Sequence, residues 1–169
     1  MAIQPLAFDL LRTDHVLTDA QLARFGLSGS AFPGLTLTVR PMKDGLVERE
    51  VTFRALQSET LERHIYRLPH YAATAAVRHE LGGEQWVIDK QGSELDPDAV
   101  WEVDGQRVAV EYDAGYRPDV VRRKMAFFRE AYDQTVWATP SALRTARMQA
   151  KYPHVRALTV DYWTPPRIE

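Results

Sequence analysis

The sequence predicts an α/β protein on the basis of three observations. Residues 71–161 show helix and strand patterns in the order α-β-β-β-α-β-α-β. Within them, Asp104-Gly105 joins two alternating apolar runs, which favours a hairpin with a type I′ turn because both central residues of that turn need positive φ. The first 70 residues show short helical patterns followed by strand-like runs. We therefore expect two domains, residues 1–70 and 71–169.

Composition limits the chemistry that the chain can perform. Its 169 residues include no cysteine, which excludes disulfides, thiolate metal sites and cysteine nucleophiles. No apolar run is long enough to cross a membrane and no basic-then-apolar leader is present, so we expect a cytoplasmic protein without a membrane partner. The formal net charge of −2 gives no overall attraction to nucleic acid, so a nucleic-acid surface must be a local patch.

Two short helices are expected at the N-terminus. Residues 6–17 place leucine and valine at helical spacing. Thr18 is followed three residues later by Gln21, which matches a capping box and predicts that a second helix begins there. Gly26 is placed to end this helix after Phe25.

The next segment is ambiguous between helix and strand. Residues 30–43 have apolar side chains at helical spacing, and we expect a third helix there. Residues 35–39 also alternate like a strand, which leaves the strand interpretation open. Two strands are expected afterwards, over residues 46–53 and 64–68.

This order of elements resembles that of winged helix-turn-helix proteins. Asp44-Gly45-Leu46-Val47-Glu48-Arg49 is similar to the join between recognition helix and wing in that family. The resemblance implies that the third helix enters the major groove of DNA and that the wing touches the phosphate backbone. The implied DNA-binding residues are Arg40, Lys43, Arg49 and Arg54. The alternative is a module for homodimerisation or for docking to another protein.

The second part begins with an alanine-rich helix. Pro118 favours the start of a later helix, because a proline at the first helical position loses no hydrogen bond. The stripe of Val121, Met125, Phe128 and Tyr132 should be its buried face. The expected elements are helix 71–81, strand 84–89, the hairpin, helix 118–133, strand 135–138, helix 141–151 and strand 155–161.

Three carboxylates are expected to meet at one end of the hairpin. Asp98 precedes the first strand, and Glu111 and Asp113 lie on one face at the end of the second. Like charges that lie close together repel one another unless a cation or a proton neutralises them, so a metal site is one explanation. The other is that Asp98 begins a turn, Glu111 pairs with an arginine and Asp113 faces water.

The order of elements, with Pro97-Asp98 before the hairpin and Glu111-x-Asp113 after it, resembles the PD-(D/E)xK nuclease superfamily. The resemblance implies that Asp98 and Glu111 bind Mg²⁺ and that Glu80 adds a helical acid. The family's lysine position is Asp113 here, which departs from the pattern. Lys124, on the following helix, can take the catalytic role instead, or it can form an ordinary ion pair with Asp113.

Together, the two halves resemble the replication-relaxation family of plasmid and mobile-element proteins. This resemblance implies a DNA-binding protein with a nuclease-like domain. Its catalytic residues would be Asp98, Glu111, Asp113 and Lys124. Three functions stay open: a Mg²⁺-dependent endodeoxyribonuclease, a non-enzymatic DNA-binding regulator that keeps the nuclease fold, and a protein-docking module. Arg122, Arg123 and Arg129 form either a basic patch or a solvated face.

Overall fold

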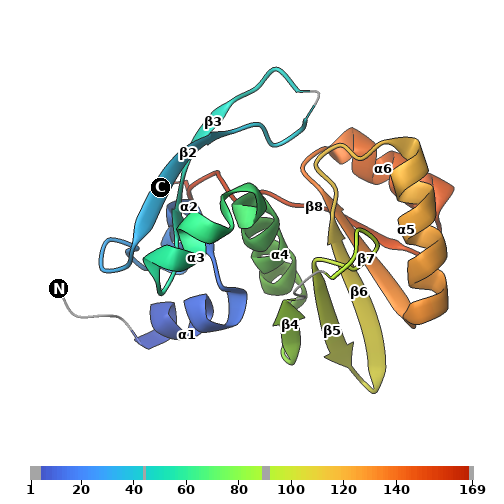
Figure 1. Cartoon of the computed structure of the whole chain (residues 1–169), viewed down its shortest axis with the longest axis horizontal. Coiled ribbons are helices and arrows are strands. Elements are labelled where there is room, and N and C mark those ends of the chain that lie inside the picture. The colour runs from blue at the N-terminus through green and yellow to red at the C-terminus, as the bar shows by residue number, and fades with distance from the viewer. Residues whose placement is uncertain (1–4, 44, 89–91, 168–169) are drawn as a thin grey trace. The chain divides into compact units, whose positions relative to one another are not determined.

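The computed structural model describes residues 5–43, 45–88 and 92–167. The chain forms two compact units, shown in Figure 1: a first of residues 1–41, 45–76 and 161–169, and a second of residues 42–44 and 77–160. The expected boundary after residue 70 falls inside helix α4 (Leu68–Leu81), whose residues belong to both units. Within the described residues, no helix combines the length and the apolar character that crossing a membrane requires.

The first unit combines short helices with a three-stranded antiparallel sheet. The strand order is β1-β3-β2. Its apolar cluster includes Leu11, Leu22, Phe32 and Ala75, which come from α1, α2, the loop before β2 and α4. The elements are α1 (Pro5–Asp14), β1 (Leu17–Thr18), α2 (Asp19–Arg24), β2 (Gly34–Val39), β3 (Arg49–Arg54), α3 (Ser58–Arg63), a 3₁₀-helix (Ile65–Arg67) and the first part of α4.

The capping box at the start of α2 is confirmed. The Thr18 hydroxyl accepts a hydrogen bond from the Gln21 amide at 3.1 Å, and the Gln21 side chain accepts one from the Thr18 amide at 2.9 Å. The helix ends at Arg24, and Gly26 follows with a φ of 68°, a conformation that glycine adopts without steric cost. The second expected helix is therefore present, and the first ends three residues earlier than expected, at Asp14.

Two expected elements of the first unit are wrong. The helix expected over residues 30–43 is instead strand β2, which pairs with β3 over six residues. The alternation in residues 35–39 outweighs the helical spacing because β-branched threonines pack well across a hairpin, and the Thr36 and Thr52 hydroxyls bond at 2.8 Å. The strand expected over residues 64–68 is a 3₁₀-helix leading into α4, with the Arg67 and Leu68 amides bonded locally to the His64 carbonyl.

The second unit confirms the predicted order α-β-β-β-α-β-α-β. Its five-stranded sheet has the order β4-β5-β6-β7-β8; β4, β5 and β6 are antiparallel, whereas β6, β7 and β8 are parallel. The elements after α4 are β4 (Trp86–Ile88), β5 (Ala99–Val103), β6 (Gln106–Tyr112), α5 (Pro118–Ala131), β7 (Gln134–Thr139), α6 (Ala142–Lys151) and β8 (Arg156–Thr159).

The hairpin between β5 and β6 is also confirmed. Asp104 and Gly105 both have positive φ, 51° and 74°, as a type I′ turn requires. The register pairs Val103 with Gln106 at the turn and Ala99 with Val110 at the other end. Asp98, directly before Ala99, therefore lies beside Glu111, directly after Val110.

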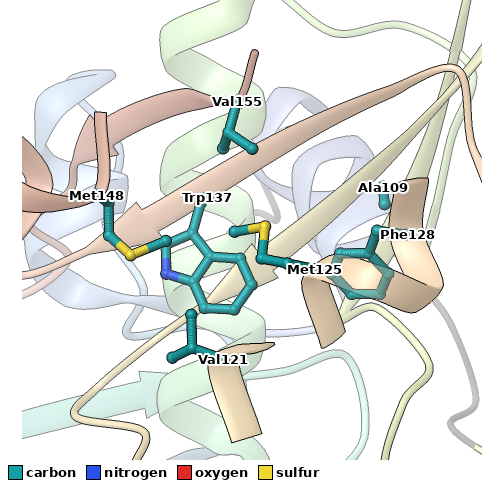
Figure 2. Close-up of a cluster of buried hydrophobic side chains, with 7 residues drawn as sticks. All are labelled: Ala109, Val121, Met125, Phe128, Trp137, Met148 and Val155. Atoms are coloured by element: carbon teal, nitrogen blue, oxygen red, sulfur yellow. The ribbon is translucent and has the colours of Figure 1, made fainter. Parts of the chain in front are cut away.

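Helices α5 and α6 cover one face of the five-stranded sheet (Figure 1). Figure 2 shows their shared core, in which Trp137 of β7 lies among Val121 and Met125 of α5 and Met148 of α6. Ala109 of β6 belongs to this cluster, and Glu111 is two residues further along β6, so Glu111 points to the same face. A buried carboxylate thus lies directly beneath α5.

We expect Thr18→Ala to destabilise the first unit. Thr18 is 1% exposed, caps α2, and donates its hydroxyl proton to the Tyr162 carbonyl. Losing an N-cap costs about 1–2 kcal/mol in the free energy of unfolding, which urea denaturation measures. Thr18→Ser keeps the hydroxyl and should retain most of the stability. Equal urea midpoints for Thr18→Ala and wild type would show that the cap contributes nothing.

Candidate functional site

Two of the predicted acids meet at one end of the β5–β6 hairpin. Asp98 is 3% exposed and Glu111 is 0% exposed. One oxygen of Asp98, Oδ2, accepts a hydrogen bond from the Tyr112 amide at 2.8 Å, which holds the aspartate against the end of β6. The antiparallel register thus brings the two carboxylates together in an interior that water does not reach.

Lys124 of α5 extends into this cluster. Its side chain is 4% exposed, and Nζ lies 3.0 Å from Oε1 of Glu111. The same ammonium donates to the Asp96 carbonyl at 2.9 Å. Of the two roles that the sequence left open for Lys124, the ion pair with Asp113 is wrong: among the described residues its ammonium pairs with Glu111 instead. The catalytic role stays a prediction.

Tyr116, in the loop between β6 and α5, completes the cluster. Its hydroxyl donates to Oε1 of Glu111 at 2.8 Å, so one carboxylate oxygen receives both the tyrosine and the lysine. The other oxygen, Oε2, is buried and has no hydrogen-bond partner among the described residues. A buried acceptor without a partner is costly, so Oε2 is the weakest point of the cluster.

Burial dominates the protonation of this site. Burial and the neighbouring Asp98 raise the pKa of Glu111 well above its ordinary value, although Lys124 and Tyr116 oppose that rise. Burial and the charge of Glu111 likewise raise the pKa of the Tyr116 hydroxyl, which therefore stays protonated and remains a donor. Glu111 consequently binds a proton more readily than an exposed glutamate does.

Asp113 has a different environment from Glu111, although both are fully buried. Its Oδ1 accepts from the amides of Gly115 and Tyr116 at 2.8 and 2.6 Å. Its Oδ2 accepts from the Trp137 indole at 3.1 Å and from Nε of Arg144 at 2.9 Å. These donors saturate the carboxylate, so Asp113 fixes the turn between β6 and α5 and ties it to β7 and α6.

Trp137 and Arg144 were not predicted as parts of this region. Arg144 lies in the first turn of α6 and also donates to the Tyr116 carbonyl at 2.8 Å. Neither contact has a local sequence pattern, because the partners lie 24 and 31 residues from Asp113. The tertiary arrangement of β6, β7 and α6 brings them together.

The residues present do not fit a Mg²⁺ ion as they stand. Mg²⁺ requires near-octahedral coordination by oxygen atoms, but Oε1 of Glu111 holds the Lys124 ammonium and the Tyr116 hydroxyl. Glu80, the predicted third ligand, is exposed near the end of α4. In the ranges that the structure describes, no three histidine, aspartate or glutamate residues form a group that could hold a metal ion.

The recognition helix expected over residues 30–43 is absent and strand β2 takes its place, so Arg40 and Lys43 do not lie on a helix. Arg40 forms an ion pair with Glu48 at 2.7 Å, and Arg54 binds Asp19 at 2.8 Å. Arg49 is exposed at the start of β3. Lys43 belongs to the second unit, where its amide donates to the Ala114 carbonyl at 2.8 Å and its ammonium lies 5.5 Å from the centre of the Tyr116 ring.

Comparisons with protein-family models, with curated proteins and with solved structures find no match for this chain. The family resemblance therefore stays a prediction drawn from the residues and motifs of the sequence. Any function that we assign rests on the geometry described above.

We expect Asp113→Asn to destabilise the second unit by about 2–3 kcal/mol, because it removes a buried ion pair and leaves donors unsatisfied. Asp119→Asn is the matched control, since it breaks an exposed pair with Arg117 and should cost less than about 1 kcal/mol. Denaturant unfolding of both variants measures the difference. A loss for Asp113→Asn no larger than that of the control would refute a structural role for Asp113.

Proposed function

We propose that this chain is a DNA-binding protein whose second unit keeps the PD-(D/E)xK arrangement of acids but no longer performs the nuclease reaction. The buried ion pair between Lys124 and Glu111 supports the non-catalytic part of this proposal. The association with DNA, and with plasmid or mobile-element DNA in particular, derives from the resemblance of the sequence.

The electrostatics of the cluster explain why the ion pair matters. Two carboxylates in a dry interior repel each other and lose their hydration, so the fold needs a positive charge beside them. Lys124 supplies that charge from within the chain, at 3.0 Å from Glu111. The lysine ammonium neutralises the carboxylates as a metal ion does, but it cannot acidify a bound water molecule as a divalent metal can. The lysine therefore keeps the carboxylates neutralised but does not activate the water molecule that hydrolysis needs.

The burial of the cluster supports the same conclusion. Hydrolysis requires a phosphodiester and a water molecule to reach the acids, yet the exposed fractions of Asp98, Glu111 and Lys124 are 3%, 0% and 3%. The Tyr116 ring lies beside Lys124, with the ammonium 5.8 Å from the ring centre. In this conformation a DNA backbone contacts none of the three groups.

A Mg²⁺-dependent endodeoxyribonuclease is the second candidate. The observation that favours it is Oε2 of Glu111, a buried acceptor without a partner among the described residues, in a carboxylate that interacts electrostatically with Asp98. An ion at this position requires Lys124 to release Glu111. In the first candidate Lys124 stays paired with Glu111, whereas in the second it leaves Glu111 to the metal ion. The stability and cleavage measurements below distinguish these two roles.

The first unit is proposed to be a derivative of the winged helix. Helices α1 and α2 and the β2–β3 hairpin support this proposal, since the hairpin occupies the place of the wing in the order of elements. Residues 30–43, where the resemblance implied the recognition helix, contain turns and strand β2 instead of a helix. A module of this kind cannot insert a helix into the major groove from this segment, so its DNA contacts must come from elsewhere.

We expect Lys124→Ala to lose about 3–5 kcal/mol of stability near neutral pH, because removing one partner of a buried pair leaves an uncompensated charge. The raised pKa of Glu111 gives this loss a pH dependence. The folded protein binds the Glu111 proton more tightly than the unfolded chain, so this group favours folding at low pH and opposes folding as the pH rises. Without Lys124 that pKa rises further, and the loss should be larger at about pH 8 than at about pH 5.

Thermal unfolding of wild type and Lys124→Ala, each with and without Mg²⁺, measures these effects. Lys151→Ala, at an exposed position of α6, is the matched control and should unfold as wild type does at both pH values. If Lys124 substitutes for the metal, Mg²⁺ should stabilise Lys124→Ala and leave wild type unchanged. No loss of stability in Lys124→Ala at either pH would contradict the proposed role.

Cleavage assays separate the two candidate functions. Wild-type protein is expected to bind DNA and to leave single-stranded, double-stranded and branched DNA intact in Mg²⁺ or Mn²⁺. Cleavage by wild type that Asp98→Ala abolishes, in a variant that still folds, would establish the endonuclease instead.

A further inference from the structure

We propose that the phosphate backbone of duplex DNA binds to a surface formed by α5 and α6, here called the α5–α6 surface and defined by Arg122, Arg129, Arg147 and Lys151. This inference rests on the proposed DNA-binding function and names the part of the protein that contacts the DNA. It differs from the contact surface that the sequence implied, which lay in residues 40–54.

The charge of the chain is unevenly distributed along the sequence. The whole chain has 21 basic and 23 acidic residues. Residues 117–151, which contain α5, β7 and α6, hold eight of the basic residues and three of the acidic ones. Residues 134–160 contain no aspartate or glutamate at all. A protein of net charge −2 therefore has a strongly basic segment in its helical layer.

Four of these eight basic residues are engaged by carboxylates. Lys124 and Arg144 pair internally with Glu111 and Asp113. Arg117 pairs with Asp119 and Arg123 with Glu94 at the surface. The four residues of the α5–α6 surface are exposed, and no carboxylate forms an ion pair with them in the described part of the chain.

The contacts of α5 show which way its free arginines point. Lys124 and Arg123 reach Asp96 and Glu94, which precede β5. They therefore lie on the flank of α5 that faces β5. Arg122 and Arg129 are seven residues apart, so they share one side of the helix about 10 Å apart. At 100° per residue that side is the opposite flank, towards β7 and α6.

The contacts of α6 place its free cations in the same way. The Gln149 side chain bonds the Val155 carbonyl and the Ala157 amide at 2.9 and 3.1 Å. Strand β8 is the edge of the sheet, so Gln149 marks the flank of α6 that faces away from α5. Arg147 and Lys151, four residues apart, lie on the other flank. Arg144 confirms this direction, since it reaches the Tyr116 carbonyl just before α5.

This geometry places the four cations on the flanks of α5 and α6 that are turned toward each other. The Lys151 ammonium lies 5.3 Å from the centre of the Tyr152 ring, but none of the four cations has a carboxylate partner among the described residues. Cations without counter-charges repel one another, so this arrangement favours a bound polyanion.

Ala126, Ala146 and Ala150 are exposed on the same two helices, and their small side chains allow close approach of a backbone. Leu143, four residues before Arg147, is 61% exposed on the same flank. In the described helices α5 and α6 no aromatic side chain of the kind that anchors protein interfaces is exposed, so a phosphate backbone fits better than an acidic protein.

The test is the salt dependence of binding to a duplex of about 25 base pairs, measured by fluorescence anisotropy with the full chain. Each phosphate contact contributes about −0.9 to the slope of log K against log salt, so four contacts give a slope near −3.6. Arg122→Gln/Arg147→Gln should flatten the slope by about 2 units, and so should Arg129→Gln/Lys151→Gln. Arg12→Gln/Arg63→Gln removes the same net charge from exposed positions of the first unit and should keep the wild-type slope.

The outcomes separate this inference from the function on which it rests. Wild-type slopes in both α5–α6 variants would overturn the inference and leave DNA binding intact, and a flatter slope in Arg40→Gln/Arg49→Gln would then place DNA at the β2–β3 hairpin. Absence of DNA binding by wild type would overturn both proposals. Tighter binding of duplex RNA than of DNA, with the same loss in the variants, would overturn the assignment to DNA. Thermal unfolding verifies that each variant is folded.

Discussion

The ion pair between Lys124 and Glu111 is the constraint on which the second unit depends. Glu111 lies on the face of β6 that α5 covers, so the helix cannot pack there unless the carboxylate is neutralised. Lys124 interrupts the apolar stripe of α5 and provides that charge, while its bond to the Asp96 carbonyl ties the segment before β5 to the same helix. The buried Lys124 ammonium therefore holds both α5 and the segment before β5 at this end of the hairpin.

Glu111 and Asp113 show how environment decides the role of a carboxylate. The two residues are two positions apart, and both are fully buried. Asp113 receives donors on both oxygens from three elements, which is the arrangement of a structural residue. Glu111 has one oxygen without a partner among the described residues, and burial raises its pKa, so desolvation rather than a full set of donors governs its protonation. A sequence motif that contains both acids cannot tell their roles apart. The donors that saturate Asp113 come from Trp137, Arg144 and the backbone of the following turn, and the motif does not include these partners.

Sequence patterns correctly predicted those elements that are determined by residues close together in the chain. The Asp104-Gly105 turn and the Thr18 capping box depend on residues within four positions of each other, and both are present. Residues 30–43 fit both helical spacing and strand alternation. They contain a strand because it pairs with β3, and no local pattern in the sequence shows that pairing. The convergence of Asp98 and Glu111 followed from the hairpin register, but the pairing of Lys124 with Glu111 and of Arg144 with Asp113 required the packing of α5 and α6.

The internal ion pairs also determine what the outer layer of the second unit presents to solvent. Lys124 of α5 pairs with Glu111, and Arg144 of α6 pairs with Asp113. Because these buried acids are neutralised, they contribute no negative potential to the outer surface of the two helices. Arg122, Arg129, Arg147 and Lys151 are exposed on these helices, and 20 of the chain's 23 acidic residues lie outside residues 117–151. A chain with a net negative charge can in this way present a basic face, because long-range attraction to a polyanion depends on the local distribution of charge within about one Debye length rather than on the total.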